Sequence, residues 1–317
     1  DDFVEHIFIA TNHNYMLFFT QAGKCFWMRV YQIPEGSKTS KGRAIQNLIN
    51  LPSDDKVMAY LNVKDLKDED YLNTHYVIMC TEKGVVKKTS LEAYSRPRQN
   101  GINAIGIREG DSLLEAKLTN GQSDIMIAAK SGKAIRFHES KVRSMGRGAS
   151  GVRGIMLSSE KDKVVGMICV NNLESHVLVV SENGYGKRSD IDSYRVTNRG
   201  GKGVKTISIT PKTGELIAIK NVVDEDGLMI INKSGVMIRM KVESMRVMGR
   251  ATQGVRLINL KDSDQISSVA KVEIDQEDEI SVDDNDDNTN HELIDEVSEN
   301  DNLVEDLGDV SDGSEEE

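Results

Sequence analysis

Glycine recurs along this chain in five pairs with nearly constant internal spacing, and this regularity constrains the fold more than any other feature. The first member of each pair follows a polar turn: Gly23, Gly84, Gly132, Gly184 and Gly235. The second lies in a later polar loop: Gly42, Gly101, Gly151, Gly203 and Gly254. The separations within the pairs are 19, 17, 19, 19 and 19 residues. A self-similar period of this length predicts an array of stacked supersecondary units.

Apolar and β-branched runs flank each turn glycine, as in DIMIAAKSGKAIRF from Asp124. Glycine suits a tight hairpin because such a turn needs a positive φ. We expect four short strands in each unit; in the third unit they would begin at Leu113, Asp124, Lys133 and Val152. The sequence therefore predicts an all-β, propeller-like array with five visible units. Long helices are disfavoured because glycine and β-branched residues interrupt the chain too often.

The end of the array shows a possible sixth unit. The segment QISSVAKVEI, from Gln265, has the pattern of the first strand of such a unit, but no further strands follow it. A strand without partners at one end suggests that the partners lie at the other end. We therefore expect a missing blade before Asp1 and interpret the chain as a fragment.

Charge divides the chain into two parts. Residues 274–317 contain 20 acidic residues and no Lys or Arg, whereas residues 1–273 contain the other 31 acidic residues and all 40 basic ones. The net charge of −11 thus averages a body of +9 and a tail of −20. We expect a β-domain over residues 1–274. Residues 275–317 should be disordered, because they contain too few apolar groups to offset the entropy of folding.

Motifs for catalysis and metal binding are absent from the sequence. It contains no GxxxxGK[ST] phosphate loop, no HExxH and no GxSxG, and its six histidines are scattered. The three cysteines, Cys25, Cys80 and Cys169, are too far apart for a CxxC site. No apolar run approaches the roughly 20 residues of a membrane span. We expect a soluble, cytoplasmic, non-catalytic chain without metal or cofactor.

Basic residues recur in register around the second glycine of each pair. In units three to five they lie 11, 15 and 21 residues after the turn glycine: Arg143, Arg147, Arg153, Arg195, Arg199, Lys205, Arg246, Arg250 and Arg256. Lys202 lies in the same loop of the fourth unit. The first two units are less regular and offer Lys38, Lys41, Arg43, Arg96 and Arg98. Equivalent loops of a radial array share one edge, so these side chains are predicted to form a basic band that binds the phosphates of duplex DNA.

The fourth loop carries a resemblance to a known family. Residues 197–203 read TNRGGKG and resemble the pattern QRRGGKG of the C-terminal domains of bacterial DNA gyrase A subunits. Five of the seven positions match: Arg199, Gly200, Gly201, Lys202 and Gly203. Similar stretches are MRVYQIPEG, GVVKKTSLEAY, NGYGKR and GRATQGVRLI, which begin at residues 28, 84, 183 and 249. The resemblance extends from residue 2 to about residue 273, and the acidic tail also fits the family.

This resemblance implies a β-pinwheel, a propeller-like array, usually of six blades, whose blades exchange an outer strand. It implies wrapping of duplex DNA around the perimeter, in support of ATP-dependent negative supercoiling by the N-terminal cleavage core of gyrase A and the gyrase B subunit. ATP and Mg²⁺ would act in those other parts. The family's box lies in the first blade, whereas TNRGGKG lies in a later unit.

Two other interpretations stay open at this point. One is the related C-terminal domain of the topoisomerase IV A subunit, which typically lacks a proper box and often has fewer blades. The other is a propeller-like scaffold for protein interactions, although the repeat signatures of WD-type and similar propellers are absent.

Overall fold

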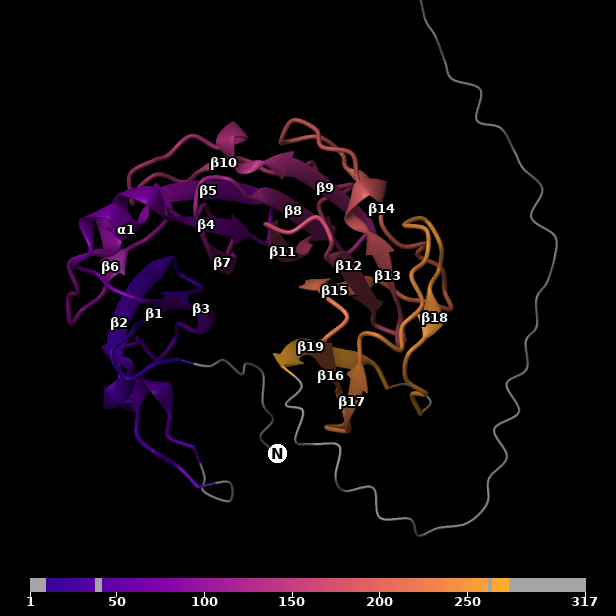
Figure 1. Cartoon of the computed structure of the whole chain (residues 1–317), viewed down its shortest axis with the longest axis horizontal. Helices are drawn as coiled ribbons and strands as arrows, with labels where there is room; N and C mark the ends of the chain where they lie inside the picture. Colours follow the sequence, from indigo (N-terminus) through magenta and orange to yellow (C-terminus); the bar gives the residue numbers. More distant parts are fainter. Residues whose placement is uncertain (1–9, 38–41, 262–263, 274–317) are drawn as a thin grey trace, which may run out of the picture. The chain divides into compact units, whose positions relative to one another are not determined.

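The structure, a computed structural model, describes residues 10–37, 42–261 and 264–273. These residues form five antiparallel β-sheets that follow one another in chain order around a common centre (Figure 1). The one α-helix among them is α1 (Glu69–Thr74), in which the side chain of Asp68 accepts a hydrogen bond from the backbone N–H of Tyr71. The prediction of an all-β, propeller-like array is confirmed. The predicted tail over residues 275–317 lies outside the described residues.

Each sheet is built on a hairpin that straddles a turn glycine. The five hairpins are β1 (Tyr15–Thr20) with β2 (Lys24–Arg29), β4 (Tyr76–Thr81) with β5 (Val85–Ser90), β8 (Asp124–Ala129) with β9 (Lys133–His138), β12 (His176–Ser181) with β13 (Tyr185–Asp190), and β16 (Asp226–Asn232) with β17 (Met237–Lys241). All five turn glycines have a positive φ, as the hairpin prediction required.

An inner strand pairs with the first strand of each hairpin. The five inner strands are β3 (Val57–Val63), β7 (Leu113–Thr119), β11 (Val164–Val170), β15 (Leu216–Val222) and β19 (Ile266–Glu273). They lie toward the centre of the array, and each contacts the next (Figure 1).

The outer strand of four sheets comes from the following unit. The outer strands are β6 (Ile102–Asn103) on β2, β10 (Val152–Arg153) on β5, β14 (Val204–Lys205) on β9 and β18 (Val255–Arg256) on β13. The sheet orders are therefore β3-β1-β2-β6, β10-β5-β4-β7, β11-β8-β9-β14 and β15-β12-β13-β18, and the fifth sheet has three described strands, β17-β16-β19. Exchange of an outer strand is the feature that defines a β-pinwheel.

The grouping of strands into units differs from the sequence-based prediction. Of the four strands expected in the third unit, those beginning at Asp124 and Lys133 stay together as β8 and β9. The strands beginning at Leu113 and Val152 both belong to the preceding sheet, as β7 and β10. The spacing along the chain gave the length of the repeat but not which strands form one sheet. Pairing is decided by which strand edges meet in space.

Two further expectations are wrong. The strand from Gln265 was expected to lack partners, but its equivalent, β19, pairs with β16 along its whole length and forms the inner edge of the fifth sheet. Gly42 was expected to match the other loop glycines, but its φ is not positive and no atom would contact a Cβ added there.

The core lies between neighbouring sheets, so that the first hairpin strands are buried on both faces. In β8, Ile125 and Ile127 pack toward the second sheet, whereas Met126 and Ala128 pack toward the fourth. A strand covered on both faces is apolar at successive positions rather than at alternate ones. This explains why DIMIAA shows only partial alternation.

The loop glycines are explained by the exchanged strands. Gly203 precedes β14 at a φ of +73°, and a Cβ there would lie 2.5 Å from the carbonyl oxygen of Ala134 on β9. Both the backbone conformation and the close approach therefore require glycine. Gly101, Gly151 and Gly254 make the same approach to the second hairpin strand of the preceding blade.

Candidate nucleic-acid interface

The basic loops of units three to five run along the blade before their own. After the 3₁₀ turns η4 (Glu139–Lys141) and η5 (Ile191–Ser193), the chain hydrogen-bonds to the preceding second hairpin strand. The backbone N–H of Met145 donates to the carbonyl of Lys88 at 2.8 Å, and that of Thr197 donates to the carbonyl of Arg136 at 2.8 Å. Met248 donates in the same way to Arg188, at 2.9 Å.

Donor side chains on the second hairpin strands fix the start of each loop. They occupy the fourth position after the turn glycine, and each donates to a backbone carbonyl of the next unit. The four bonds are Trp27 Nε1 to Tyr94 at 3.0 Å, Lys88 Nζ to Glu139 at 3.1 Å, Arg136 Nη1 to Tyr194 at 3.1 Å and Arg188 Nε to Met245 at 2.6 Å. The three cations among them are less than a tenth exposed, so they hold the loops and are not available to DNA.

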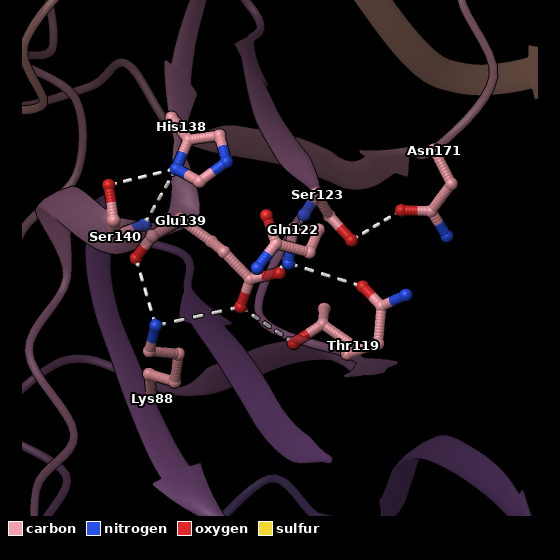
Figure 2. Close-up of polar contacts among 9 residues, drawn as sticks. Lys88, Thr119, Gln122, Ser123, His138, Glu139, Ser140 and Asn171 are labelled. Atoms are coloured by element: carbon pink, nitrogen blue, oxygen red, sulfur yellow. Dashed lines mark hydrogen bonds and ion pairs between the residues drawn. The ribbon is translucent and has the colours of Figure 1, made fainter. Parts of the chain in front are cut away.

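Figure 2 shows this contact between the second and third blades. The carboxylate of Glu139 is fully buried and accepts hydrogen bonds from the Thr119 hydroxyl and the Ser123 backbone N–H, both at 2.8 Å. Lys88 Nζ lies 3.6 Å from Glu139 Oε2. Because the buried carboxylate has two hydrogen-bond donors and a cation beside it, its charge is compensated, and the η4 turn is joined to two blades.

Two further buried lysines reach the middle of the loops. Lys87 Nζ donates to the carbonyls of Ala104 and Arg147, at 2.6 and 2.5 Å, and Lys187 Nζ donates to the carbonyl of Gly249 at 2.5 Å. Burial, with the nearby charge of Arg147, lowers the pKa of Lys87 to about 8. Burial, with the charge of Arg250, lowers the pKa of Lys187 to about 7.

Most of the predicted DNA-binding side chains lie on the exposed side of these loops. Six of them are exposed and make no hydrogen bond or ion pair with the described residues: Arg143, Arg153, Arg195, Lys202, Lys205 and Arg246. A cation without an internal partner can bind phosphate without first breaking a contact, so these six are the strongest candidates.

Successive loops lie side by side. Arg96 and Arg98 of the second unit line one shallow groove together with Arg147 of the third. Arg199 of the fourth unit donates to the carbonyls of Lys141 and Arg153, at 3.0 and 3.1 Å. Arg250 of the fifth donates to the carbonyl of Lys205 at 2.8 Å. The basic loops from residues 96 to 256 therefore form a continuous row, here called the basic band.

Three predicted contact residues have internal roles. Arg199 and Arg250 use part of their guanidinium groups to join neighbouring loops. Arg256 donates to the Tyr185 hydroxyl at 3.0 Å and lies over the same ring. We therefore expect these three to contribute less to DNA binding than their exposed neighbours.

The three basic residues predicted in the loop of the first unit are not joined to the band by any described contact. Lys38 and Lys41 lie outside the described residues. Arg43 is exposed, but no hydrogen bond or groove among the described residues links it to the later loops. For all fifteen basic residues, a role in DNA binding stays a prediction.

The RGGKG segment makes backbone contacts with the loop of the third unit. Gly200 N–H donates to the carbonyl of Gly154 at 2.6 Å, and Met156 N–H donates to the carbonyl of Gly201 at 2.9 Å. These bonds hold the segment against the residues that directly follow β10, and they leave Lys202 exposed.

Two lysines of the band were missed by the sequence analysis. Lys24 and Lys133 directly follow turn glycines, and strand exchange brings them to the loops. Lys24 shares a groove with Arg98 and Arg147. Lys133 is paired across the sheet with Lys205. The signal was the lysine after the turn glycine, but only the pairing of β9 with β14 shows that it adjoins the next unit's loop.

The described residues offer little for other chemistry. No group of three His, Cys, Asp or Glu residues among them could hold a metal ion. None of their helices is long and apolar enough to cross a membrane.

Comparison with known proteins agrees with this geometry. The family model described as DNA gyrase C-terminal domain, beta-propeller, matches residues 14–64, 75–120, 123–171, 175–222 and 228–273. The DNA gyrase A protein of Staphylococcus aureus (strain NCTC 8325 / PS 47) is 44% identical over 284 residues, which cover 89% of this chain and 32% of that protein. The chain thus spans about a third of the length of this relative.

Solved structures share the fold. The C-terminal domain of DNA topoisomerase IV has a TM-score of 0.74 at 23% identity and covers 83% of this chain and 80% of its own. The DNA gyrase A C-terminal domain has a TM-score of 0.70 at 25% identity and covers 83% of each chain. Each family repeat begins near the first hairpin strand and ends near the inner strand, which is the grouping seen in the sheets.

The strand-exchanged blades and the matching family model together place the chain among the propeller-like C-terminal domains of the gyrase type. The matches decide between the interpretations left open by the sequence. The chain belongs to the family of DNA gyrase C-terminal domains, and its Staphylococcus aureus relative is a gyrase A protein.

Proposed function

We propose that this chain binds and wraps duplex DNA along the basic band, as the non-catalytic C-terminal part of gyrase A. The observation that carries the proposal is the continuous row of exposed cations on loops from four successive units. Phosphate neutralisation by Lys and Arg supplies most of the sequence-independent affinity for DNA. A row that follows successive blades around a centre suits a duplex that bends along it.

The partners follow from the family. The proposed complex contains the N-terminal cleavage core of gyrase A and the gyrase B subunit, in the cytoplasm. There the wrapped DNA would support ATP-dependent negative supercoiling. ATP and Mg²⁺ would act in those other parts, and this chain would need no cofactor of its own.

The salt dependence of DNA binding tests the band. If about eight phosphates are neutralised, log K should fall with log salt with a slope near −7. Changing Arg195, Lys202 and Lys205 together to Ala should reduce the size of that slope by about 2 to 3 units, because each cation releases about one counterion. Fluorescence anisotropy with a labelled duplex at several salt concentrations measures both values.

A matched control uses three exposed lysines outside the band. Lys161, Lys212 and Lys261 lie in the connections that lead back to the inner strands. Their triple change to Ala should leave the slope nearly unchanged. An equal loss in both triple variants, or an affinity that does not respond to salt, would contradict the proposed interface.

A further inference from the structure

A cavity of about 580 Å³ lies among the inner strands β7, β11, β15 and β19, away from the basic loops. Three of its lining residues are lysines: Lys117, Lys220 and Lys271. Lys117 and Lys220 have the same register, opposite Ile78 and Leu178, whereas Lys271, opposite Leu228, is offset by one residue. The lining therefore brings three cations to one central site.

The charges around this cavity do not cancel. Lys117 Nζ lies 2.7 Å from Glu115 Oε1, and Lys271 Nζ lies 3.0 Å from Asp226 Oδ2. Lys220 has no hydrogen bond or ion pair with the described residues. Its pKa is lowered by burial and by the charge of Lys117, although Glu115 opposes this. These five groups sum to one positive charge, centred on the unpaired Lys220.

Neutral groups of the lining also have unused hydrogen-bonding capacity. The side-chain oxygen of Asn171 accepts from the Ser123 hydroxyl, which leaves its amide nitrogen without a partner among the described residues (Figure 2). Asn221 Oδ1 and Ser268 Oγ are buried and unpartnered. A side-chain amide can be turned to present its N–H group and a hydroxyl can donate its proton, so each of the three can donate into the cavity. Asn171 is exposed, but the Asn221 and Ser268 oxygens are buried. Buried polar groups are normally hydrogen-bonded, so two unpartnered ones in the same lining indicate a ligand.

We propose that this central cavity binds a small oxyanion of the inorganic phosphate class through Lys220, with Asn171, Asn221 and Ser268 as hydrogen-bond donors. Phosphate offers several strong acceptor oxygens to one cation and three neutral donors, and charge-assisted hydrogen bonds of this kind are the stronger ones. The anion also compensates the positive charge that the three lysines bring together. This site is separate from the basic band and does not depend on the proposed DNA binding.

Inorganic phosphate is the probe, titrated by calorimetry at constant ionic strength into the whole chain. We expect one saturable site, with binding weakened at least tenfold by Lys220→Met, which keeps the apolar stem of the side chain. Lys161→Met, on an exposed loop, should bind like the unchanged chain. The triple Ala variant at Arg195, Lys202 and Lys205 should also keep this site, which separates it from phosphate on the basic band.

A second variant covers the case in which Lys220→Met does not fold. Ser268→Ala removes one donor without a change of charge and should weaken phosphate binding several-fold. No saturable binding, or binding that survives both changes and is lost in the band variant, would overturn the proposal.

Discussion

Lys187 is a residue of the protein interior that also positions a loop of the candidate interface. Its side chain is fully buried, yet it ends on the carbonyl of Gly249 in the neighbouring basic loop. The Lys87 side chain makes the equivalent contact in the second blade, at Arg147. Each therefore positions a loop from inside, whereas the exposed cations of that loop face solvent.

The lowered pKa of Lys187 predicts a pH dependence. In the unfolded chain a lysine holds its proton up to a pH of about 10.4, but in the folded chain its pKa is about 7. Between these values the unfolded state binds more protons, so the free energy of unfolding rises with pH. From pH 7 to 8.5 this lysine should add about 1.6 kcal/mol. Urea unfolding at both pH values, compared between the unchanged chain and Lys187→Met, measures the difference.

The change in unfolding free energy caused by Lys187→Met should thus depend on pH, whereas that caused by Lys161→Met, at an exposed site, should not. If both variants follow the unchanged chain in parallel across this range, Lys187 keeps an ordinary pKa and the argument is wrong.

At the scale of elements, the exchanged outer strand is the feature that fixes the loops. Each outer strand has only two residues, so its pairing alone contributes little. Three features act together at each exchange. The loop glycine permits the close approach, and the two-residue strand pairs with the second hairpin strand of the preceding blade. The donor side chain at the fourth position after the turn glycine holds the start of the loop.

A pair of substitutions within RGGKG tests this arrangement. Gly203→Ala places a Cβ 2.5 Å from the Ala134 carbonyl at a φ of +73°, and it should cost about 2 kcal/mol or more in unfolding free energy. Gly201→Ala has only Ile135 Cδ1 nearby, at 3.6 Å, and should change the free energy by about 0.5 kcal/mol or less. Denaturant unfolding gives both numbers. Similar losses in the two variants would show that the close approach of β14 to β9 is not what requires glycine.

At the scale of the whole molecule, opposite charges lie on one chain. Residues 1–273 carry +9 and residues 274–317 carry −20. A covalently attached segment has a high effective concentration, so even weak attraction of its carboxylates to the basic band would compete with DNA. Removing residues 275–317 should therefore tighten DNA binding several-fold at low salt.

The gain from this truncation should shrink as salt rises, because screening weakens both attractions. Anisotropy titrations of the two chains at several salt concentrations measure it. Equal affinities at low ionic strength would leave the acidic segment with no part in DNA binding.

The sequence by itself determined the class of fold and the position of the basic loops. The glycine pairs report positive φ and close backbone approach, which are local requirements that a sequence shows directly. The regular offsets of Arg143, Arg195 and Arg246 predicted equivalent loops, and these side chains are exposed on them.

Only the tertiary structure decided which strands share a sheet and which cations are available. Lys88, Arg136 and Arg188 have the same charge as the loop residues, but the packing of the next unit buries them against its carbonyls. The pairing of β7 and β10 with the second blade, and of Lys133 with Lys205, depends on strand edges that are distant in sequence. Such contacts are set by what meets in space, and a pattern along the chain carries no record of them.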